Sequence, residues 1–534
     1  MTLFQQFIDS RMITDQYLKN LNDPSHPPLW GTGLFKSLVY QAKCANAHIV
    51  VLPDFDMDGI MAGTVGTSGL RALGLRCDVY HSDPTQGYGI TPNDIIKIID
   101  QFPDVTTIIT CDVGITAFDA INYAASRGIE VIVTDHHVEL TNHVPVNAVV
   151  RIDPSSTLDP YPNKSICGAH VFWQLLTSYA EDFGTREAQD AVSWLRVCAG
   201  IATMSDSMMM IRENRKLVTD MLNGLNYIKD NPLPDIDENV RNVLRGFKLF
   251  MELCPPDSGH IDQDYLAFNV IPAFNAVKRM DQQTDIAFDV FFGDEERQIA
   301  CIKRLLVLNE EKKRMIAQYM NDLKASVQPL EPYIYFTDAP NGVAGLIATR
   351  LMGQNNCTTI VLNNDTLTGS GRSPLNAISL WSDKFKLAGH QHAFGVDIKD
   401  RTEAKRFYEA IKKATQETPV KKKQVDVETD DQISIGEITD FMNQVQQFAP
   451  FGPGFKLPQV SLTFDPANAN YSLLSGGQHL KVTLANGVNV LLWNYGEKMS
   501  DIMNAKKVHL LGSFKYNYFK EQKSVQFSAD SIWF

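Results

Sequence analysis

The chain has 534 residues, of which 44% are hydrophobic and 21% charged, so it is long enough to form several domains with separate cores. It contains no apolar run of about 18 residues, and its N-terminus lacks the basic and apolar regions of a signal peptide, which argues against membrane insertion and secretion. We therefore expect a cytoplasmic protein. The formal net charge of -13 argues mildly against a protein that coats nucleic acid over its whole surface, although it is compatible with a locally basic channel.

Four short runs rich in β-branched residues predict strands in the first third of the chain. They are "HIVVLPDFD" at 48–56, "TTIITCDVG" at 106–114, "EVIVTDHH" at 130–137 and "NAVVRIDP" at 147–154. The segments between the runs are long enough for crossover helices. This alternation is typical of an α/β domain with a parallel sheet and helices on both faces.

Acidic and histidine residues follow three of these four runs, at the strand ends where the ligands of open α/β sheets gather. A fifth apolar stretch, "VCAGIATMSD" at 197–206, brings one more aspartate to this region if it is a strand or a buried helix end. Any single aspartate after a strand is more often a helix N-cap or a turn residue. The joint occurrence of so many such residues favours a metal centre. The residues concerned are Asp54, Asp56, Asp58, Asp112, Asp135, His136, His137 and Asp206.

The type of these side chains indicates which metal they would bind. Carboxylate oxygens with one or two imidazoles suit a pair of Mn²⁺ or Mg²⁺ ions. The eight cysteines are scattered without a CxxC pair, which indicates reduced thiols and argues against a zinc site or a disulfide framework. Two such ions activate a water molecule and stabilise the leaving oxygen in phosphoester hydrolysis. The sequence therefore predicts a two-metal phosphoesterase.

The rest of the chain divides into further modules. Residues 210–330 have helical periodicity and predict a long connecting region. Residues 413–435 combine proline, a lysine run and an acidic run, and are expected to form an exposed, mobile loop or linker. From residue 456 onward, alternating runs such as "HLKVTLANGVNVLLWNY" predict an OB-type barrel in which "ANG" forms a hairpin turn. Its aromatic side chains would either stack on bases or pack in the core; they are Trp493, Tyr516, Tyr518 and Phe519.

Four motifs, in the order "DFDMDG", "TCDVG", "TDHH" and "TMSD", resemble those of the DHH phosphoesterase superfamily. Further segments are similar to RecJ, a family of bacterial single-strand DNA exonucleases; they are "QGYGIT", "ICGAHVFWQLL", "ENRKLV", "IPAFNAVKRM" and "LNEEKKRM". The RecJ substrate domain is resembled by "GVAGLIATRL", "GSGRSP" and "AGHQHAFG", and the start and core of the RecJ OB-fold by "PFGPGF" and "GGQHLKVTL". The resemblance spans roughly residues 30–530 in the right order.

This resemblance implies a domain organisation and a function. The implied segments are a parallel-sheet α/β DHH catalytic domain at 1–209, a helical connector at 210–328, a smaller α/β DHHA1-type substrate domain at 329–412, a linker and helix at 413–449, and an OB-fold β-barrel at 450–534. The implied function is metal-dependent 5′→3′ hydrolysis of single-stranded DNA to 5′-mononucleotides, with two Mn²⁺ or Mg²⁺ ions. Single-stranded DNA is the implied partner, a single-strand-binding protein or other repair proteins are candidate partners, and no membrane is involved.

The resemblance also implies roles for particular residues. The metal-binding positions are Asp54, Asp56, Asp58, Asp112, His136 and Asp206, and which of the first three bind the metal directly stays open. His137 would be catalytic, against the scissile phosphate, and Asp135 would support the histidines. The substrate-binding positions are Ser370, Arg372 and Ser373 in a phosphate-contacting loop, His390, Arg350 and Arg279. From the residues alone, "GSGRSP" is more typical of a loop and Arg350 of a solvated cation.

The chain departs from the RecJ pattern at a few positions. Asp83 and Ala273 stand where the family usually has arginines, and Lys278 and Ala388 stand where glycines are typical. Fewer arginines reduce the counterion-release contribution to DNA affinity, so we expect low processivity. Two alternatives remain: a DHH-family phosphodiesterase for short oligonucleotides or cyclic dinucleotides, which would not need an OB-fold, and a non-catalytic RecJ-like DNA-binding scaffold, which would not need clustered carboxylates.

Overall fold

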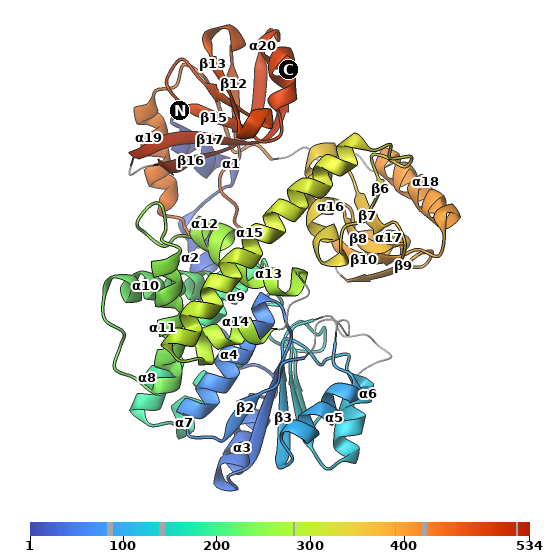
Figure 1. The fold of residues 1–534 in the computed structure, drawn as a ribbon. Helices are drawn as coiled ribbons and strands as arrows, with labels where there is room; N and C mark the ends of the chain where they lie inside the picture. Colours follow the sequence, from blue (N-terminus) through green and yellow to red (C-terminus); the bar gives the residue numbers. More distant parts are fainter. Residues whose placement is uncertain (83–88, 138–144, 281–283, 390, 418–423, 520–521) are drawn as a thin grey trace. The chain divides into compact units, whose positions relative to one another are not determined.

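The computed structural model of the protein describes residues 1–82, 89–137, 145–280, 284–389, 391–417, 424–519 and 522–534 (Figure 1). The chain forms two compact units. The first contains the described residues of Met1–Tyr80, Gly89–Phe268 and Lys423–Phe534, and the second those of His81–Tyr88 and Asn269–Lys422. Throughout the described ranges, no helix combines the length and the apolar character needed to cross a bilayer.

A five-stranded parallel sheet organises the first part of unit one. Its strands, in spatial order, are β2 (Cys77–Val79), β1 (His48–Pro53), β3 (Val105–Cys111), β4 (Glu130–Thr134) and β5 (Val150–Ile152). The four predicted strands are confirmed, and only the short β2 was not predicted. Because the predicted runs are apolar at successive positions, both faces of the sheet can be buried under helices.

Helices cover both faces of this sheet, as Figure 1 shows. Val50 and Leu52 on β1 pack against one helical layer, formed by α5 (Pro92–Gln101) and α6 (Phe118–Ser126). The opposite face is covered by α3 (Thr32–Cys44), α4 (Met57–Ala72) and α7 (Gly168–Phe183). The predicted parallel-sheet α/β domain is therefore confirmed.

A helical layer extends this domain. It consists of α8 (Arg186–Trp194), α9 (Arg196–Ser205), α10 (Arg212–Asp230) and α11 (Glu238–Leu253), and α9 packs against both α4 and α10. Asp206 is the residue that ends α9. Of the two alternatives left open for this stretch, the buried helix end is correct, because Val197 to Thr203 are buried in a helix.

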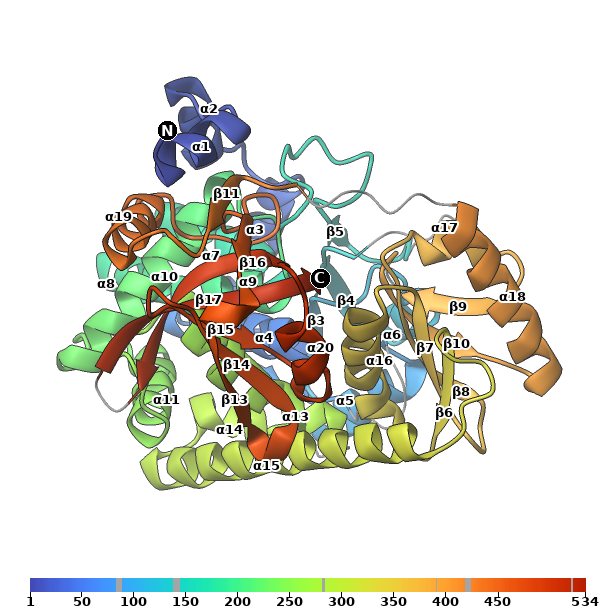
Figure 2. The same ribbon diagram turned by 90° about the horizontal axis from the view of Figure 1, so that it is seen from above.

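Unit two has a mixed sheet preceded by a helical region. The helices α13 (Ile271–Arg279), α14 (Asp285–Phe292) and the 31-residue α15 (Glu295–Ala325) form this region. Helices α10 and α11, which the resemblance placed in the same connector at 210–328, belong to unit one instead. The sheet has the order β6 (Ile334–Thr337), β7 (Thr359–Asn363), β8 (Thr368–Arg372), β10 (Ala393–Asp397) and β9 (Lys386–Gly389). Helix α16 (Asn341–Asn355) lies on one face, and α17 (Ala377–Trp381) and α18 (Arg401–Glu417) lie on the other (Figure 2).

The C-terminal part of unit one is a seven-stranded sheet. Its order is β11 (Val427–Asp430), β12 (Val460–Phe464), β16 (Val508–Phe519), β17 (Gln522–Trp533), β15 (Asn489–Leu492), β14 (His479–Thr483) and β13 (Asn470–Leu474), accompanied by α19 (Ile435–Gln446) and α20 (Met499–Met503). The predicted "ANG" hairpin joins β14 to β15, with Gly487 at a φ of 86°. This positive φ explains the glycine at the turn. The predicted OB-like sheet is confirmed.

The predicted linker at 413–435 is wrong for its acidic part. Residues 427–430 form the edge strand β11, which pairs in parallel with β12. Asp426 is 4% exposed, and its two oxygens accept hydrogen bonds from Arg11 at 2.9 and 2.6 Å. The acidic run suggested a solvated segment because the sequence does not reveal a partner more than 400 positions away. Residues 418–423 lie outside the described ranges.

Arg11 follows the first of two N-terminal helices that pack against the C-terminal sheet. Leu3 and Phe7 of α1 (Leu3–Ser10) and Leu21 of α2 (Asp15–Asn22) share a core with strand residues such as Val427. The resemblance assigned residues 1–209 to a single catalytic domain. In the structure the first 22 residues contribute instead to the core of the C-terminal sheet.

The burial of Phe7 generates a prediction about stability. Phe7 is fully buried, so we expect Phe7→Ala to lower the unfolding free energy of the C-terminal sheet by about 3–5 kcal/mol through lost burial and the cavity left behind. Denaturant unfolding followed by the fluorescence of Trp493 and Trp533 would measure it. The control, Met12→Ala, changes a side chain that is 79% exposed and should leave the transition within about 0.5 kcal/mol. An unchanged transition in Phe7→Ala would contradict this packing.

Candidate metal centre

The three aspartates after β1 lie where the strand turns into α4. Asp56 is the N-cap of α4 and accepts hydrogen bonds from the N–H groups of Asp58, at 3.1 Å, and Gly59, at 3.3 Å. Asp58, in the first turn, is 2% exposed and accepts from the N–H groups of Gly168, at 2.7 Å, and Ala169, at 2.9 Å, which begin α7. Two of these carboxylates therefore satisfy helix N-termini, a role that the sequence analysis weighed against metal binding.

Close backbone approach brings these carboxylates together. A Cβ atom on Gly59 would lie 2.3 Å from the carbonyl oxygen of Asp54, and one on Gly168 would lie 2.5 Å from the Cβ of Asp112. Both distances are far inside van der Waals contact, so only glycine fits at either position. The segment "ICGAHVFWQLL" thus supplies both a close contact and two backbone donors, a role that sequence reasoning did not identify.

His136 connects the remaining predicted ligands. Its Nε2 atom lies 3.0 Å from Oδ1 of Asp112, which follows β3, and 3.6 Å from Oδ2 of both Asp58 and Asp206. Asp112 is 2% exposed and has a φ of 62°, an uncommon conformation for a residue other than glycine. These contacts gather the ends of β1, β3 and β4 and the end of α9 around one imidazole.

Asp135 forms hydrogen bonds with both histidines. One of its oxygens, Oδ1, accepts from the N–H groups of His136, at 2.7 Å, and His137, at 3.1 Å, and lies 2.8 Å from Nδ1 of His137. The other, Oδ2, accepts from the N–H of Ile115 at 2.9 Å. Both oxygens of this residue thus accept hydrogen bonds, and the residue is 1% exposed, so Asp135 fixes the backbone around the two histidines and the ring of His137.

Burial and mutual repulsion destabilise the charged forms of these carboxylates. Burial, followed by the charge of Asp56, raises the pKa of Asp58 to about 6 despite its two backbone donors. Burial, followed by the charges of Asp58 and Asp56, raises the pKa of Asp206 to about 8. For Asp112, burial and then Asp58 raise the pKa well above its usual range. A bound cation would relieve this repulsion.

His137 responds in the opposite direction. Burial alone would lower the pKa of His137, but its hydrogen bond to Asp135 and the charges of Asp135, Asp54 and Asp206 raise it to about 9. The ring is therefore protonated at neutral pH. Asp135 keeps a lowered pKa, because its hydrogen bond with His137 and the charges of both histidines outweigh the effect of burial. The Nε2 atom of His137 is therefore a hydrogen-bond donor rather than an acceptor.

Three overlapping groups of side chains have the geometry to hold a metal ion. In each group the ligand atoms lie within 4.8 Å of one another; the groups are Asp54–Asp56–Asp112, Asp58–His136–Asp206 and Asp112–His136–His137. Carboxylate oxygens and imidazole nitrogens suit Mn²⁺ and Mg²⁺. Burial raises the pKa of the nearby Cys111 and Cys167 thiols well above the usual range, which disfavours thiolate ligation. The residues present therefore fit a pair of such ions.

The predicted substrate-binding residues belong to unit two, where two arginines lie along α16. Arg279 donates from Nη1 to the carbonyl of Gly342 at 3.2 Å. The Nη2 atom of Arg372 is 2.7 Å from the position that a Cβ of Gly345 would occupy. Burial, followed by the charge of Arg279, lowers the pKa of Arg372, so the two guanidinium groups share one region.

The other predicted substrate-binding residues differ from one another in burial and in hydrogen bonding. Ser370 lies two positions before Arg372 on β8, and so on the same face of the sheet. Ser373 is 2% exposed, and its hydroxyl lies 2.7 Å from that of Thr358 and accepts from the N–H of Leu375, which gives it a structural role. Arg350 is exposed on α16. His390 lies outside the described residues.

Lys312 is a cation near this region that the sequence analysis did not single out. It lies on α15, is 5% exposed, and donates from Nζ to the carbonyl of Pro272 at 2.6 Å. Burial, followed by the charges of Arg279 and Lys313, lowers the pKa of Lys312 to about 8. The charged run "NEEKKRM" suggested a solvated helix face, and only the packing reveals that one lysine of the run is buried.

Comparisons with known proteins agree with this geometry. Residues 48–201 match the family model "DHH family, N-terminal domain", and residues 429–531 match the model "RecJ OB domain". The single-stranded-DNA-specific exonuclease RecJ of Haemophilus influenzae is 24% identical over 97% of this chain and 93% of its own length. The chain thus contains a DHH-family domain and a RecJ OB domain, and it resembles RecJ along most of its length. The RecJ of Escherichia coli is also 24% identical, over 93% of this chain and 89% of its own length.

The solved structures show the same fold. The crystal structure of RecJ in complex with Mn²⁺ from Thermus thermophilus matches 99% of this RecJ-like chain and 77% of its own chain, with 20% identity and a TM-score of 0.76. A crystal structure of exonuclease RecJ bound to manganese matches 74% of this chain and 96% of its own, with 22% identity and a TM-score of 0.58. The parallel-sheet and OB-like parts therefore belong to one known architecture.

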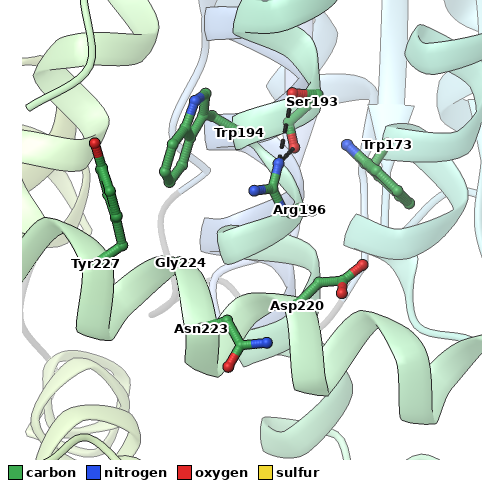
Figure 3. Close-up of a pocket in the computed structure, with 8 residues that line it drawn as sticks. All are labelled: Trp173, Ser193, Trp194, Arg196, Asp220, Asn223, Gly224 and Tyr227. Carbon is green, nitrogen blue, oxygen red and sulfur yellow. Dashed lines mark hydrogen bonds between the residues drawn. The ribbon is translucent and has the colours of Figure 1, made fainter.

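A pocket of about 530 Å³ in this RecJ-like protein lies away from the metal centre (Figure 3). It is lined by α7, α8, α9 and α10, and Arg196 in its wall begins the helix that ends at Asp206, about 15 Å away at 1.5 Å per residue. Arg196 donates to the carbonyl of Ser193 at 2.7 Å, and its guanidinium lies 4.8 Å from the ring of Trp194. The predicted site residues are not among the lining residues, so this pocket is separate from the metal centre.

The raised carboxylate pKa values predict how the metal-free protein responds to pH. With a folded pKa of about 8 against an ordinary value of 3.8, Asp206 binds more protons when folded than when unfolded across this interval. The stability of chelated protein should therefore fall as the pH rises from 6.5 to 8, and His137, with its pKa of about 9, acts in the same direction. Thermal unfolding in a chelator across this range would measure it.

Two comparisons sharpen this measurement. Asp206→Asn should flatten the pH dependence, because it removes one titrating carboxylate. Added Mn²⁺ should reverse the trend, because metal binding favours the deprotonated ligands. A chelated protein that became more stable between pH 6.5 and 8 would contradict the proposed repulsion. Below pH 6.5 the buried, neutral His170, whose pKa burial lowers to about 3, would complicate the result.

Proposed function

We propose that this protein is a two-metal phosphodiesterase that degrades single-stranded DNA from its 5′ end to 5′-mononucleotides. The observation that carries this proposal is the group of buried carboxylates around His136, in a chain that is similar to single-stranded-DNA-specific exonucleases named RecJ over most of its length. Because the proposed substrate is DNA, we expect a cytoplasmic location. A single-strand-binding protein or other repair proteins are candidate partners.

The metal ligands in this proposal are the acidic residues and one histidine that the structure gathers. One ion would be held by Asp54, Asp56 and Asp112, and the other by Asp58, His136 and Asp206. When bound, such a pair of Mn²⁺ or Mg²⁺ ions activates a water molecule and stabilises the leaving oxygen. Because Asp112 also lies 3.0 Å from His136, it stands next to both proposed groups of ligands.

His137 would act on the substrate phosphate. Asp135 lies 2.8 Å from its Nδ1 atom and helps to raise the pKa of the ring to about 9, which leaves Nε2–H as the donor for a substrate. A protonated imidazole in this position donates a charged hydrogen bond to a phosphate oxygen and stabilises charge that develops in the transition state. His137 is thus the proposed catalytic residue, and Asp135 orients it.

Unit two would bind the terminal phosphate. Arg372 and Ser370 share one face of β8. Arg372 and Arg279, the last residue of α13, both lie next to α16. Arg350 and His390 remain proposed substrate contacts from the resemblance. The structural hydrogen bonds of Ser373 favour a role in shaping this loop. A site that closes on a terminal phosphate would favour attack from the chain end, and the missing arginines at Asp83 and Ala273 favour low processivity.

The two alternative functions are less well supported. A phosphodiesterase for short oligonucleotides or cyclic dinucleotides would not require the OB-like sheet, which matches the RecJ OB domain over residues 429–531. A non-catalytic scaffold would not require buried carboxylates with raised pKa values, which cost stability when no cation is bound. Both observations favour the exonuclease.

The polarity of cleavage tests this function directly. We expect an oligonucleotide with different labels at its two ends to release labelled mononucleotide first from the 5′ end, and a circular single strand to resist cleavage. Asp112→Asn, which keeps the volume of the side chain and removes its charge, should abolish turnover and leave the fold intact. Early release from the 3′ end, cuts in the circle, or near-normal turnover of Asp112→Asn would refute the assignment.

The substitution Arg372→Ala tests the proposed contact with the terminal phosphate. We expect the apparent KM for 5′-phosphorylated strands to rise by an amount typical of a lost charged hydrogen bond, about 1.5–3 kcal/mol, with a smaller change in kcat. The same variant should discriminate less between strands with and without a 5′ phosphate. Arg406→Ala is the matched control, because this side chain is 69% exposed on α18. Equal KM changes in both variants would argue against a specific contact.

A further inference from the structure

Two of the family-like motifs have no role in the metal centre or the substrate site. They are "ENRKLV" at 213–218, in the first turns of α10, and "PFGPGF" at 450–455, in the loop before β12. In the structure these two segments contact each other within unit one, next to the turn that carries Asp206.

Asn214 connects the Asp206 turn to α7, the helix whose first N–H groups donate to Asp58. It is fully buried, and its Nδ2 donates to the carbonyls of Ser165, at 2.6 Å, and Met209, at 2.9 Å. Its Oδ1 lies 3.1 Å from Nδ1 of His170 in the first turn of α7, the turn whose N–H groups bind Asp58. One amide therefore spans the supports of two proposed metal ligands.

Arg215, the next residue, holds the loop that leads into the OB-like sheet. It is 4% exposed and donates from Nη1 to the carbonyl of Pro450 at 2.6 Å and from Nη2 to that of Phe448 at 2.8 Å. Its guanidinium lies 5.0 Å from the ring of Phe455. Burial lowers the pKa of Arg215 to about 10, so it remains charged at neutral pH and keeps its donors.

The loop also touches the Asp206 turn directly. The N–H of Met210 donates to the carbonyl of Pro453 at 2.6 Å. A Cβ on Gly454, where φ is 82°, would lie 2.8 Å from Cε of Met209. Ser207 and Arg212 both have positive φ, at 54° and 51°, so the backbone on each side of the contact is constrained. A displaced loop would therefore remove a hydrogen bond four residues from Asp206.

We propose that Asn214 and Arg215 are positioning residues that couple the loop at 448–455 to the metal centre, so that docking of this loop sets the affinity of the Asp206 side for its ion. Asn214 keeps the Asp206 turn and the start of α7 in register, and Arg215 holds the loop against the same turn. The proposal rests on the proposed metal ligands and adds that the segment leading to the OB-like sheet controls one of them.

The test measures Mn²⁺ binding to the full-length protein by calorimetry, with the metal alone and no DNA. We expect Arg215→Met to weaken Mn²⁺ binding about tenfold, within the range found when a residue that orients a ligand is removed, and Arg215→Lys to give an intermediate value. Lys216→Met is the matched control, because this neighbouring side chain is 57% exposed and pairs with Asp220 on the surface. It should bind Mn²⁺ like the unmodified protein.

A second variant reaches the same contact from the loop. Gly454→Ala leaves α10 unchanged and forces the loop away through its strained φ, so it should weaken Mn²⁺ binding to a similar extent. Hydrogen exchange should increase at residues 203–211 in both variants and not in Lys216→Met. If either variant folds and binds Mn²⁺ as tightly as the unmodified protein, the coupling is refuted.

The result also separates this coupling from the proposed function. An unmodified protein that binds Mn²⁺ but does not cleave single-stranded DNA would refute the nuclease and leave the coupling to be decided by the two variants. An unmodified protein that does not bind Mn²⁺ would overturn both the metal centre and the coupling. A nuclease whose Mn²⁺ affinity is the same in every variant would overturn the coupling alone.

Discussion

The fold of the first unit has to accommodate the mutual repulsion of several buried carboxylates. Asp54, Asp58 and Asp112 are each no more than 3% exposed, and they meet because parallel strands deliver their carboxyl ends to one edge of a sheet. The surrounding structure limits the cost with fixed donors, such as the first N–H groups of α7 and the ring of His136. Glycines at 59 and 168 allow the approach, and a divalent cation would balance the remaining charge.

The second unit carries positive charge near its predicted substrate-binding residues. Arg279, Arg372 and the buried Lys312 form a cationic region around α13, α15 and α16, whereas the proposed metal ligands of the first unit are acidic apart from histidine. A phosphodiester strand carries negative charge along its whole length, so a carboxylate site can bind it only through cations.

The parts that could be predicted from the sequence are those encoded by local patterns. Apolar runs identified β1, β3, β4 and β5, and the acidic residues after them pointed to the candidate metal centre, because a strand end and the residues that follow it are close in the chain. Contacts between distant segments could not be predicted in this way. Asp426 lies in a segment that was predicted to be a mobile linker, because nothing near it identifies Arg11 as its partner. The burial of Lys312 was not predicted, because its neighbours in the sequence are charged.

The N-terminal helices have a consequence for how the protein is made. Phe7 belongs to a core whose other members come partly from the N-terminal helices and mostly from residues at or after Val427, so the two contributions leave the ribosome about 420 residues apart. At typical synthesis rates this separation lasts about 20–80 s. During that time α1 lacks its packing partners β11 and α19, while the parallel sheet between it and the ribosome can fold. The C-terminal sheet is thus completed only when a very long loop closes, which slows this last step of folding.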